Sequence, residues 1–306
     1  MKILVIACTL LVAHSIRSTV NIKLEYTFRV GDQFVITQAT KQTMMQSVMG
    51  MAQPGVNTYT GVMSLKVFSL TNTGAKLEAK FLALKNRSQT ILGDITMDSD
   101  GPNNSTGNRA FKAITQKTFF VIIDTNGKVR DIENSENLWT GISALGMDSD
   151  EEMKLRESLG QWLNKNALIS NVEQAMVYYD GKKVSPGDTW ISRSQFPMDF
   201  PIQIDNTWNL TTLDGSTAMV KAQGTYTTTD REKVLTLPNG MKTKVDFTGK
   251  QQLESSVDTK TGWPISLRID AKLNGKMTML AGGFLPQDME MPTIIETGTT
   301  YTYDRK

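Results

Sequence analysis

The side chains that most often carry enzyme chemistry are almost absent from this sequence of 306 residues. It contains one cysteine, Cys8, and one histidine, His14, both close to the amino terminus. A serine–histidine–aspartate triad, a cysteine–histidine nucleophile pair and most zinc sites each require one of these residue types. Other catalysis would rest on carboxylates, lysine, tyrosine or hydroxyl groups, and no spacing selects a catalytic pair of carboxylates. We therefore expect a protein that is not an enzyme and that holds no cofactor and no metal ion.

Methionine is the other residue type whose spacing could serve a site. The chain has 17 methionines, and Met-x-Met pairs occur at 49–51, 277–279 and 289–291. Two residues at this spacing share one face of a β-strand, so each pair would present two thioethers, which are soft ligands suited to Cu(I). Flexible methionines also fill cores and line adaptable apolar cavities. We predict a ligand site from seven residues: Met45, Met49, Met51, Phe81, Trp162, Met277 and Met279.

An apolar run at residues 3–13 follows Met1 and Lys2. A helix needs about 20 apolar residues to cross a bilayer core of about 30 Å, so this run is too short to span a membrane. The pattern is typical of a secretory signal. We expect cleavage after Ser15, with Ser18 as the alternative position, and export to the periplasm or the cell exterior. No later segment is comparably apolar, so we expect no transmembrane span.

Two other interpretations of the amino terminus stay open. Residues 5–8 resemble a lipobox, in which Cys8 would become the acylated first residue of a lipoprotein. Only seven residues would precede that cysteine, which leaves almost no apolar core for the signal. The apolar run could also form a buried first strand. Cleavage removes both Cys8 and His14, so it also removes imidazole and thiolate chemistry and any disulfide from the mature chain.

The charge of the chain is nearly balanced, with 33 basic and 31 acidic residues. Nucleic-acid-binding surfaces concentrate lysine and arginine on one face, often interleaved with aromatic residues. Here the basic residues are scattered, with only short pairs such as Lys182-Lys183. We therefore expect no nucleic-acid partner.

Alternation of apolar and polar residues is the strongest structural pattern, and it predicts β-strands with one wet face. The clearest example predicts one apolar face made of Trp263, Ile265, Leu267, Ile269, Ala271, Leu273, Met277 and Met279. Polar residues such as Arg268 and Asp270 take the opposite face. Turn dipeptides such as Asn126-Gly127 and Asp180-Gly181 separate the alternating runs. Sheets that are wet on one face are commonly antiparallel.

Helical spacing appears mainly in the middle of the chain. Ser149 and Glu152 form a capping-box pattern. Leu155, Leu159 and Trp162 then recur at the spacing of one helix face. The sequence therefore predicts an α+β fold, mainly antiparallel β, with a helical connector packed against the sheet.

The β-rich stretches before and after these helices resemble each other. Gly31-Asp32-Gln33-Phe34 opens the first, and Gly187-Asp188-Thr189-Trp190 opens the second. We interpret this as an internal duplication giving two related lobes of long curved strands. The expected division is a signal at 1–15, an N-terminal lobe at 24–133, a connector at 134–180 and a C-terminal lobe at 181–306.

The order of several short motifs is more specific than any one of them. The motifs are FRVGDQF at 28–34, QTMMQSVMG at 42–50, MDSD at 97–100, Lys128-Val129 after Gly127, and VSPGDTW at 184–190. In this order they resemble domain-of-unknown-function family 6263, secreted proteins found chiefly in Bacteroidota-type bacteria. The resemblance covers most of the chain from about Leu24 onward, and it implies export and two lobes but no activity and no catalytic residues. In shape, long antiparallel strands with helices across them are similar to periplasmic lipoprotein-carrier half-barrels.

These observations favour a noncatalytic binding protein of the cell envelope whose ligand is apolar, a lipid or a lipidated chain. The alternative is a structural or interaction module that presents its surface to an envelope protein partner. A methionine-based Cu(I) site is a third and minor interpretation. An apolar cavity would favour the binding protein, whereas closed cores would favour the interaction module.

Overall fold

The computed structural model describes residues 21–306 apart from 92, 197–199, 238–239 and 283–284. The predicted signal, with Cys8, His14 and both cleavage positions, lies outside the described residues.

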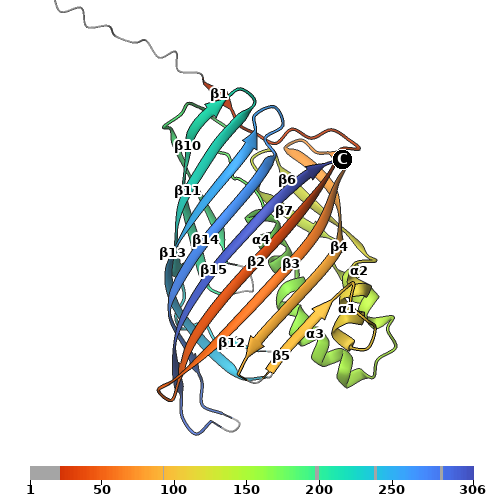
Figure 1. Cartoon of the computed structure of the whole chain (residues 1–306), viewed down its shortest axis with the longest axis vertical. Coiled ribbons are helices and arrows are strands. Elements are labelled where there is room, and N and C mark those ends of the chain that lie inside the picture. Colours follow the sequence, from red (N-terminus) through yellow and green to blue (C-terminus); the bar gives the residue numbers. More distant parts are fainter. Residues whose placement is uncertain (1–20, 92, 197–199, 238–239, 283–284) are drawn as a thin grey trace, which may run out of the picture.

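The described chain is dominated by long strands, with helices in its middle (Figure 1). The strands are β1 (Ile22–Lys23), β2 (Gln33–Val48), β3 (Met51–Leu70), β4 (Gly74–Thr90), β5 (Gly93–Asp98), β6 (Thr118–Asp124), β7 (Val129–Glu133), β8 (Lys183–Val184), β9 (Thr189–Gln195), β10 (Ile202–Asp214), β11 (Thr217–Thr228), β12 (Leu235–Thr236), β13 (Lys242–Asp258), β14 (Pro264–Met279) and β15 (Met289–Arg305). The helices are α1 (Thr106–Ile114), α2 (Glu136–Ser143), α3 (Ser149–Leu163) and α4 (Lys165–Gln174).

Thirteen of the described strands form one antiparallel sheet in the order β7-β6-β4-β3-β2-β15-β14-β13-β11-β10-β9, with β5 paired to β4 and β12 paired to β13. Most neighbouring strands follow one another along the chain, except that β5 and β12 lie off the path and that β2 pairs with β15, the first long strand with the last. The predicted class, mainly antiparallel β with helices packed against the sheet, is confirmed. Both β-rich stretches contribute to this one sheet, and the small sheet of β1 and β8 also joins them. The duplication and the exact lobe boundaries stay predictions.

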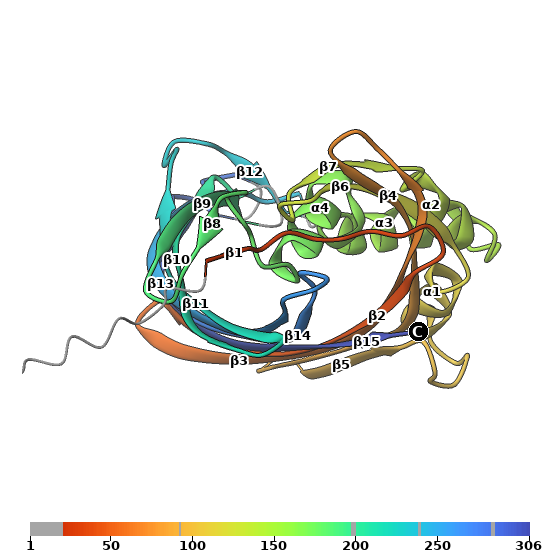
Figure 2. The same cartoon turned by 90° about the horizontal axis from the view of Figure 1, so that it is seen from above.

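The large sheet is strongly curved, and helices lie on its concave side. Seen from above, α3 and α4 face the inner wall formed by β14, β15 and β2 (Figure 2). The two edge strands, β7 and β9, come from opposite halves of the chain. Helix α4 packs against β7. The concave face is therefore enclosed partly by sheet and partly by helix.

Strand β14 carries the predicted alternation, with one exception. Leu267, Leu273 and Met279 are buried on its inner face. Ile265, predicted to share that face, is instead 48% exposed. The register between β13 and β14 shifts at this point, because Ser256 is opposite Ser266 whereas Val257 is opposite Pro264. Ile265 is thus the extra residue of a β-bulge, which reverses which side of the strand faces inward.

Helix α3 begins one residue earlier than the predicted capping box implies. Asp148, not Ser149, is the N-cap, and its carboxylate accepts a hydrogen bond from the Glu151 backbone N–H at 2.8 Å. Glu152 is engaged elsewhere, accepting from Arg156 Nε at 2.8 Å. The helix ends at Leu163, and Asn164 caps α4 through the Ala167 N–H. This break turns the chain so that α3 and α4 both face the sheet.

Buried apolar residues form two separate clusters. The larger unites the helices with most strands and includes Leu65, Phe119 and Leu168. The smaller lies at one end of the sheet and consists of Ile202, Ile204, Tyr226, Val245, Phe247 and Leu273. We call this second group the distal cluster. The inner face between the two clusters is where the candidate site lies.

Candidate ligand-binding cavity

A cavity of about 450 Å³ lies between the concave face of the sheet and helices α3 and α4. Its size falls within the range of about 300–1,000 Å³ that is usual for small-molecule sites. Helix residues such as Phe111, Leu159 and Leu168 form an apolar wall. At the distal cluster the wall continues with Tyr226 and Leu273.

The opposite wall carries a row of mainly uncharged polar side chains, interrupted by Ala271 and Gly224. Strand registers place these residues side by side across nine strands, in the order Ser88, Asn57, Gln42, Thr297, Ala271, Gln251, Gly224, Asn206 and Ser192. We call this set the polar row. Cross-strand neighbours lie close enough to interact directly, so the row forms a band that crosses the sheet.

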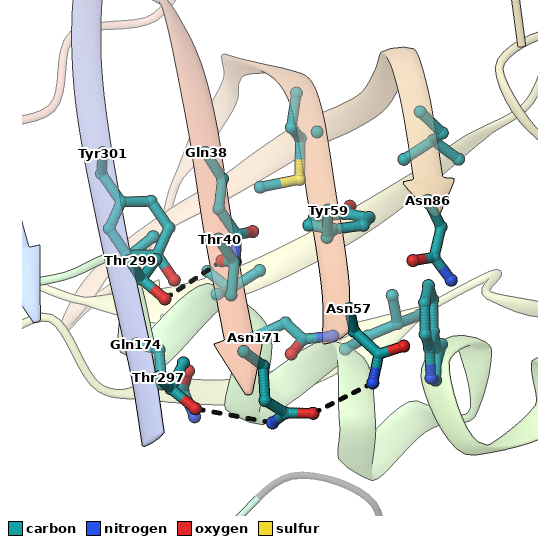
Figure 3. Close-up of a pocket in the computed structure, with 18 of the residues that line it drawn as sticks. Gln38, Thr40, Asn57, Tyr59, Asn86, Asn171, Gln174, Thr297, Thr299 and Tyr301 are labelled. Atoms are coloured by element: carbon teal, nitrogen blue, oxygen red, sulfur yellow. Dashed lines mark hydrogen bonds between the residues drawn. The ribbon is translucent and has the colours of Figure 1, made fainter. Parts of the chain in front are cut away.

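Most of the polar row is internally hydrogen-bonded. Asn57 Nδ2 donates to Gln42 Oε1 at 3.3 Å, and Gln42 Nε2 donates to Thr297 Oγ1 at 3.5 Å (Figure 3). Further along, Gln251 Nε2 donates to Asn206 Oδ1 at 2.8 Å. Gly224 lies between these two residues in register, and a Cβ there would clash with both side chains. The glycine therefore makes room for the Gln251–Asn206 bond.

A second level of polar groups lies beside the row, nearer the larger cluster. Asn86, Tyr59, Thr40 and Thr299 are successive partners across β4, β3, β2 and β15. The Thr40 and Thr299 hydroxyls are hydrogen-bonded at 3.0 Å (Figure 3). The Tyr59 side chain folds over Gly61, where a Cβ would clash with its ring and hydroxyl. Tyr301 lies two residues further along β15 and also lines the cavity.

Among the described residues, the cavity lining contains no aspartate, glutamate, lysine or arginine. Its ionisable groups are tyrosine hydroxyls, and burial raises the pKa of Tyr59 and Tyr301 above the ordinary value of 10.0. Both hydroxyls therefore stay neutral at physiological pH. General acid–base catalysis works best with a group that titrates near the working pH, and no lining residue is of that kind.

A second cavity of about 370 Å³ adjoins the first and shares Gln174, Gln251 and Ile269 with it. It lies between α4 and edge strand β9, and charged residues line it. Glu173 is one of them: its carboxylate accepts a hydrogen bond from the Val129 N–H at 3.1 Å, and burial raises its pKa. The two cavities are therefore neighbours on the concave side of the sheet, and the second lies where α4 and β9 face each other.

Two of the seven predicted site residues, Phe81 and Trp162, line the main cavity. The Trp162 ring meets Tyr59 edge-on, with centroids 5.8 Å apart. Phe81 packs against Phe119 with centroids 5.7 Å apart. Strand β4 and helix α3 thus bring these two predicted aromatic residues to one site.

The five predicted methionines do not line either cavity. Met49 and Met51 are 81% and 64% exposed near the β2–β3 turn, and Met45 is exposed nearby on β2. Met277 and Met279 pair across strands with Met291 and Met289, at the distal end of the sheet. Ligand binding by these five methionines stays a prediction that the cavity does not support.

The residues missed by sequence reasoning are the uncharged polar ones of the inner face. Gln38, Thr40 and Gln42 alternate along β2 and all line the cavity. Their spacing of two was a usable signal, but in a single sequence it is indistinguishable from the wet face of a strand. Which residues stand beside them depends on pairing with β15, more than 250 residues away.

Two further properties hold for the described part of the chain. No helix there is long and apolar enough to cross a membrane. No group of three or more His, Cys, Asp or Glu side chains among the described residues is placed to hold a metal ion.

A family model described as "Family of unknown function (DUF6263)" matches residues 72–264. The chain belongs to this family. The resemblance drawn from the short motifs is thereby confirmed over the matched residues. No curated protein matches the chain.

Solved structures show only distant similarity. Lipovitellin, in a structure titled for its lipid–protein interactions, is 9% identical with a TM-score of 0.46. The match covers 91% of this chain, which spans a quarter (25%) of that one. An outer membrane channel from Pseudomonas putida F1 is 7% identical with a TM-score of 0.28, covering 90% and 97% of the two chains. The β domain of the Bordetella autotransporter BrkA is 6% identical with a TM-score of 0.23, covering 89% and 99%.

Proposed function

We propose that this chain is a noncatalytic binding protein of the cell envelope, and that its cavity holds a largely apolar ligand such as a lipid or a lipidated chain. The observation that carries the proposal is the 450 Å³ cavity, which is mainly apolar and has no charged side chain among its described lining residues. A ligand pocket of this kind is mostly apolar and uses a few polar groups to orient what it binds.

The cavity favours binding over the alternative of a structural module. A module that only presents surface to a partner gains nothing from an internal void, because an unfilled cavity loses packing contacts. Here the void lies between two buried apolar clusters, where closer packing would stabilise the fold. Retaining this space is consistent with a ligand that fills it.

The lining also favours binding over catalysis. Nucleophilic or acid–base chemistry needs a side chain that can be activated or can titrate at working pH. Thr40, Thr299 and Tyr301 supply hydroxyls, but none of the described lining residues is a base that could activate them. Location in the envelope is proposed from the amino-terminal apolar run that follows Lys2.

Native mass spectrometry of protein purified from its own cell envelope tests this function. The expected result is a bound mass that organic extraction releases and identifies as a lipid. Protein whose mass corresponds to the bare chain, with a stoichiometric protein partner in its place, would favour the interaction module instead. The same spectrum reports the processed amino terminus, expected at Ile16 or Thr19.

A further inference from the structure

The inner wall of the cavity contains buried polar side chains that have no hydrogen-bond partner in the described part of the chain. Asn86 is 8% exposed and Tyr301 is 2% exposed. Both line the cavity, and neither side chain forms a hydrogen bond with a described residue. Their polar atoms are not fully enclosed by protein, because Trp263 Nε1 is the only such unpaired side-chain atom among the described residues, so they open onto the cavity. A native fold that keeps two such groups at a cavity wall is arranged for something that enters the cavity.

Buried polar groups a short distance away are paired with one another. Tyr226 donates its hydroxyl hydrogen to Gln251, which donates in turn to Asn206. These residues reach across neighbouring strands of the same inner face. The sheet can thus satisfy its own amides and hydroxyls by cross-strand bonds. Asn86 and Tyr301 differ because their polar atoms are directed to the cavity.

The unpaired groups are spread along the wall. Asn86 is on β4 and Tyr301 is on β15, separated by β3 and β2. At about 4.8 Å between neighbouring strands, the polar stretch is on the order of 14 Å long. Gln174 of α4 faces it from the opposite side of the cavity (Figure 3). The polar part of a ligand would therefore be a group with several donors and acceptors.

We infer that the cavity selects an uncharged amphiphile: a lipid whose neutral polar group, bearing hydroxyls, esters or amides, hydrogen-bonds to Asn86 and Tyr301 while its acyl chain lies against the apolar walls. This inference rests on the proposed function and names the ligand class. The acyl chain would extend along α3 residues such as Leu159 and toward Leu273 of the distal cluster.

A charged head group does not suit this site. An ionised carboxylate or phosphate removed from water needs a cationic partner or several donors, and no described lysine or arginine lines the cavity. The adjoining cavity does contain charged groups. There Arg193 is paired with Asp205 at 2.7 Å, Lys128 is exposed to solvent, and Glu173 would repel an anion.

The test compares two ligands with the same chain and different head groups, 1-monooleoylglycerol and oleate, with 1-octadecene as the headless reference. Binding to the delipidated full-length protein is measured by displacement of a neutral fluorescent probe, at a pH where oleate is ionised. We expect monooleoylglycerol to bind about tenfold or more tightly than oleate, a difference of about 1.4 kcal/mol or more. Equal or tighter binding of oleate would overturn the inference and leave the proposed function standing. Failure of all three ligands to bind would overturn the proposed function itself.

Variants connect the preference to the two residues. Tyr301→Phe and Asn86→Leu should each weaken monooleoylglycerol binding by about fivefold or more and leave 1-octadecene binding unchanged. The matched control is Tyr303→Phe on the same strand. The Tyr303 hydroxyl donates to the Ala175 carbonyl, and Tyr303 does not line the cavity. A preference for monooleoylglycerol that survives both variants, or that Tyr303→Phe reduces equally, would overturn the assignment of these residues.

Discussion

Two buried regions of the molecule differ in how tightly their side chains pack. At one end, Tyr26, Phe28, Phe34, Tyr179 and Trp263 form what we call the aromatic end, in which Phe34 stacks on Trp263 with centroids 3.7 Å apart. In the middle, the cavity is lined by helix side chains such as Leu159, by the polar row from Ser88 to Gln251, and by groups without a described partner such as Asn86. The first region is closed and mainly aromatic, whereas the second is hollow, with apolar helix side chains on one wall and polar strand side chains on the other.

Their hydrogen bonds show what the difference means. At the aromatic end, Tyr179 donates to the Gly262 carbonyl at 2.7 Å, and the Tyr26 hydroxyl accepts from the Val177 N–H at 2.9 Å. These bonds tie together segments far apart in the chain, including the amino-terminal segment that crosses above the sheet (Figure 2). Trp263 Nε1 is the exception there, a fully buried donor without a partner in the described chain. The aromatic end therefore contributes closed packing, whereas the cavity leaves a space that, under the proposed function, a ligand fills.

The largest expected effect comes from opening the aromatic end. Phe34→Ala removes the ring that stacks on Trp263 and should destabilise the protein by about 3–5 kcal/mol. Denaturant titration measures this as a fall in the free energy of unfolding. The neighbouring Val35→Ala, on the other face of β2, should have a clearly smaller effect. Similar costs for the two variants would show that the aromatic end does not dominate stability.

The same substitution, tyrosine to phenylalanine, can be made in both regions. Tyr179→Phe leaves the Gly262 carbonyl without its tyrosine donor and should cost about 1–3 kcal/mol. Tyr301→Phe removes a hydroxyl that has no described partner, so ligand-free protein should change by no more than about 0.5 kcal/mol. Thermal or urea unfolding of the two ligand-free variants measures both changes in the free energy of unfolding. A larger loss in Tyr301→Phe would mean that its hydroxyl supports the fold.

Glu173, in the adjoining cavity, predicts a dependence of stability on pH. Burial raises its pKa above the ordinary value of 4.5, so the folded chain binds this proton more tightly than the unfolded chain. Its contribution to stability is therefore greatest below pH 4.5 and is lost as pH rises through the raised folded pKa. Glu173→Gln can still accept from the Val129 N–H and should gain in stability relative to wild type across that range. Urea titrations at several pH values test this, and a constant difference between the two proteins would contradict it.

Much of the fold could be predicted from the sequence, because alternation and helix spacing are local signals. The burial of Leu267 and Leu273 follows from the period of β14, and the position of Trp162 follows from helix spacing. Ile265 was predicted on the wrong face, because a bulge depends on the partner strand as well as on the sequence of β14 itself. Asp148 replaced Ser149 as the cap because either side chain can serve as an N-cap.

The candidate site was far less predictable. The polar row joins β4 to β9 through seven intervening strands, so no single stretch of sequence contains it. The methionines were selected by composition, but Met49 lies at a turn with φ of 52° and its side chain is exposed to solvent. Phe81 and Trp162 line the same cavity, and their role in ligand binding stays a prediction.

The central claim is that ligand fills the main cavity, and one matched pair of variants tests it most directly. Ala271 lines the cavity, whereas its neighbour Lys272 faces outward and pairs with Glu296. Ala271→Trp should fill the space and abolish binding of 1-monooleoylglycerol and of the fluorescent probe, while Lys272→Trp should bind both as wild type does. Circular dichroism confirms that both variants are folded. Undiminished binding in a folded Ala271→Trp protein would contradict the account, because the ligand would then lie elsewhere.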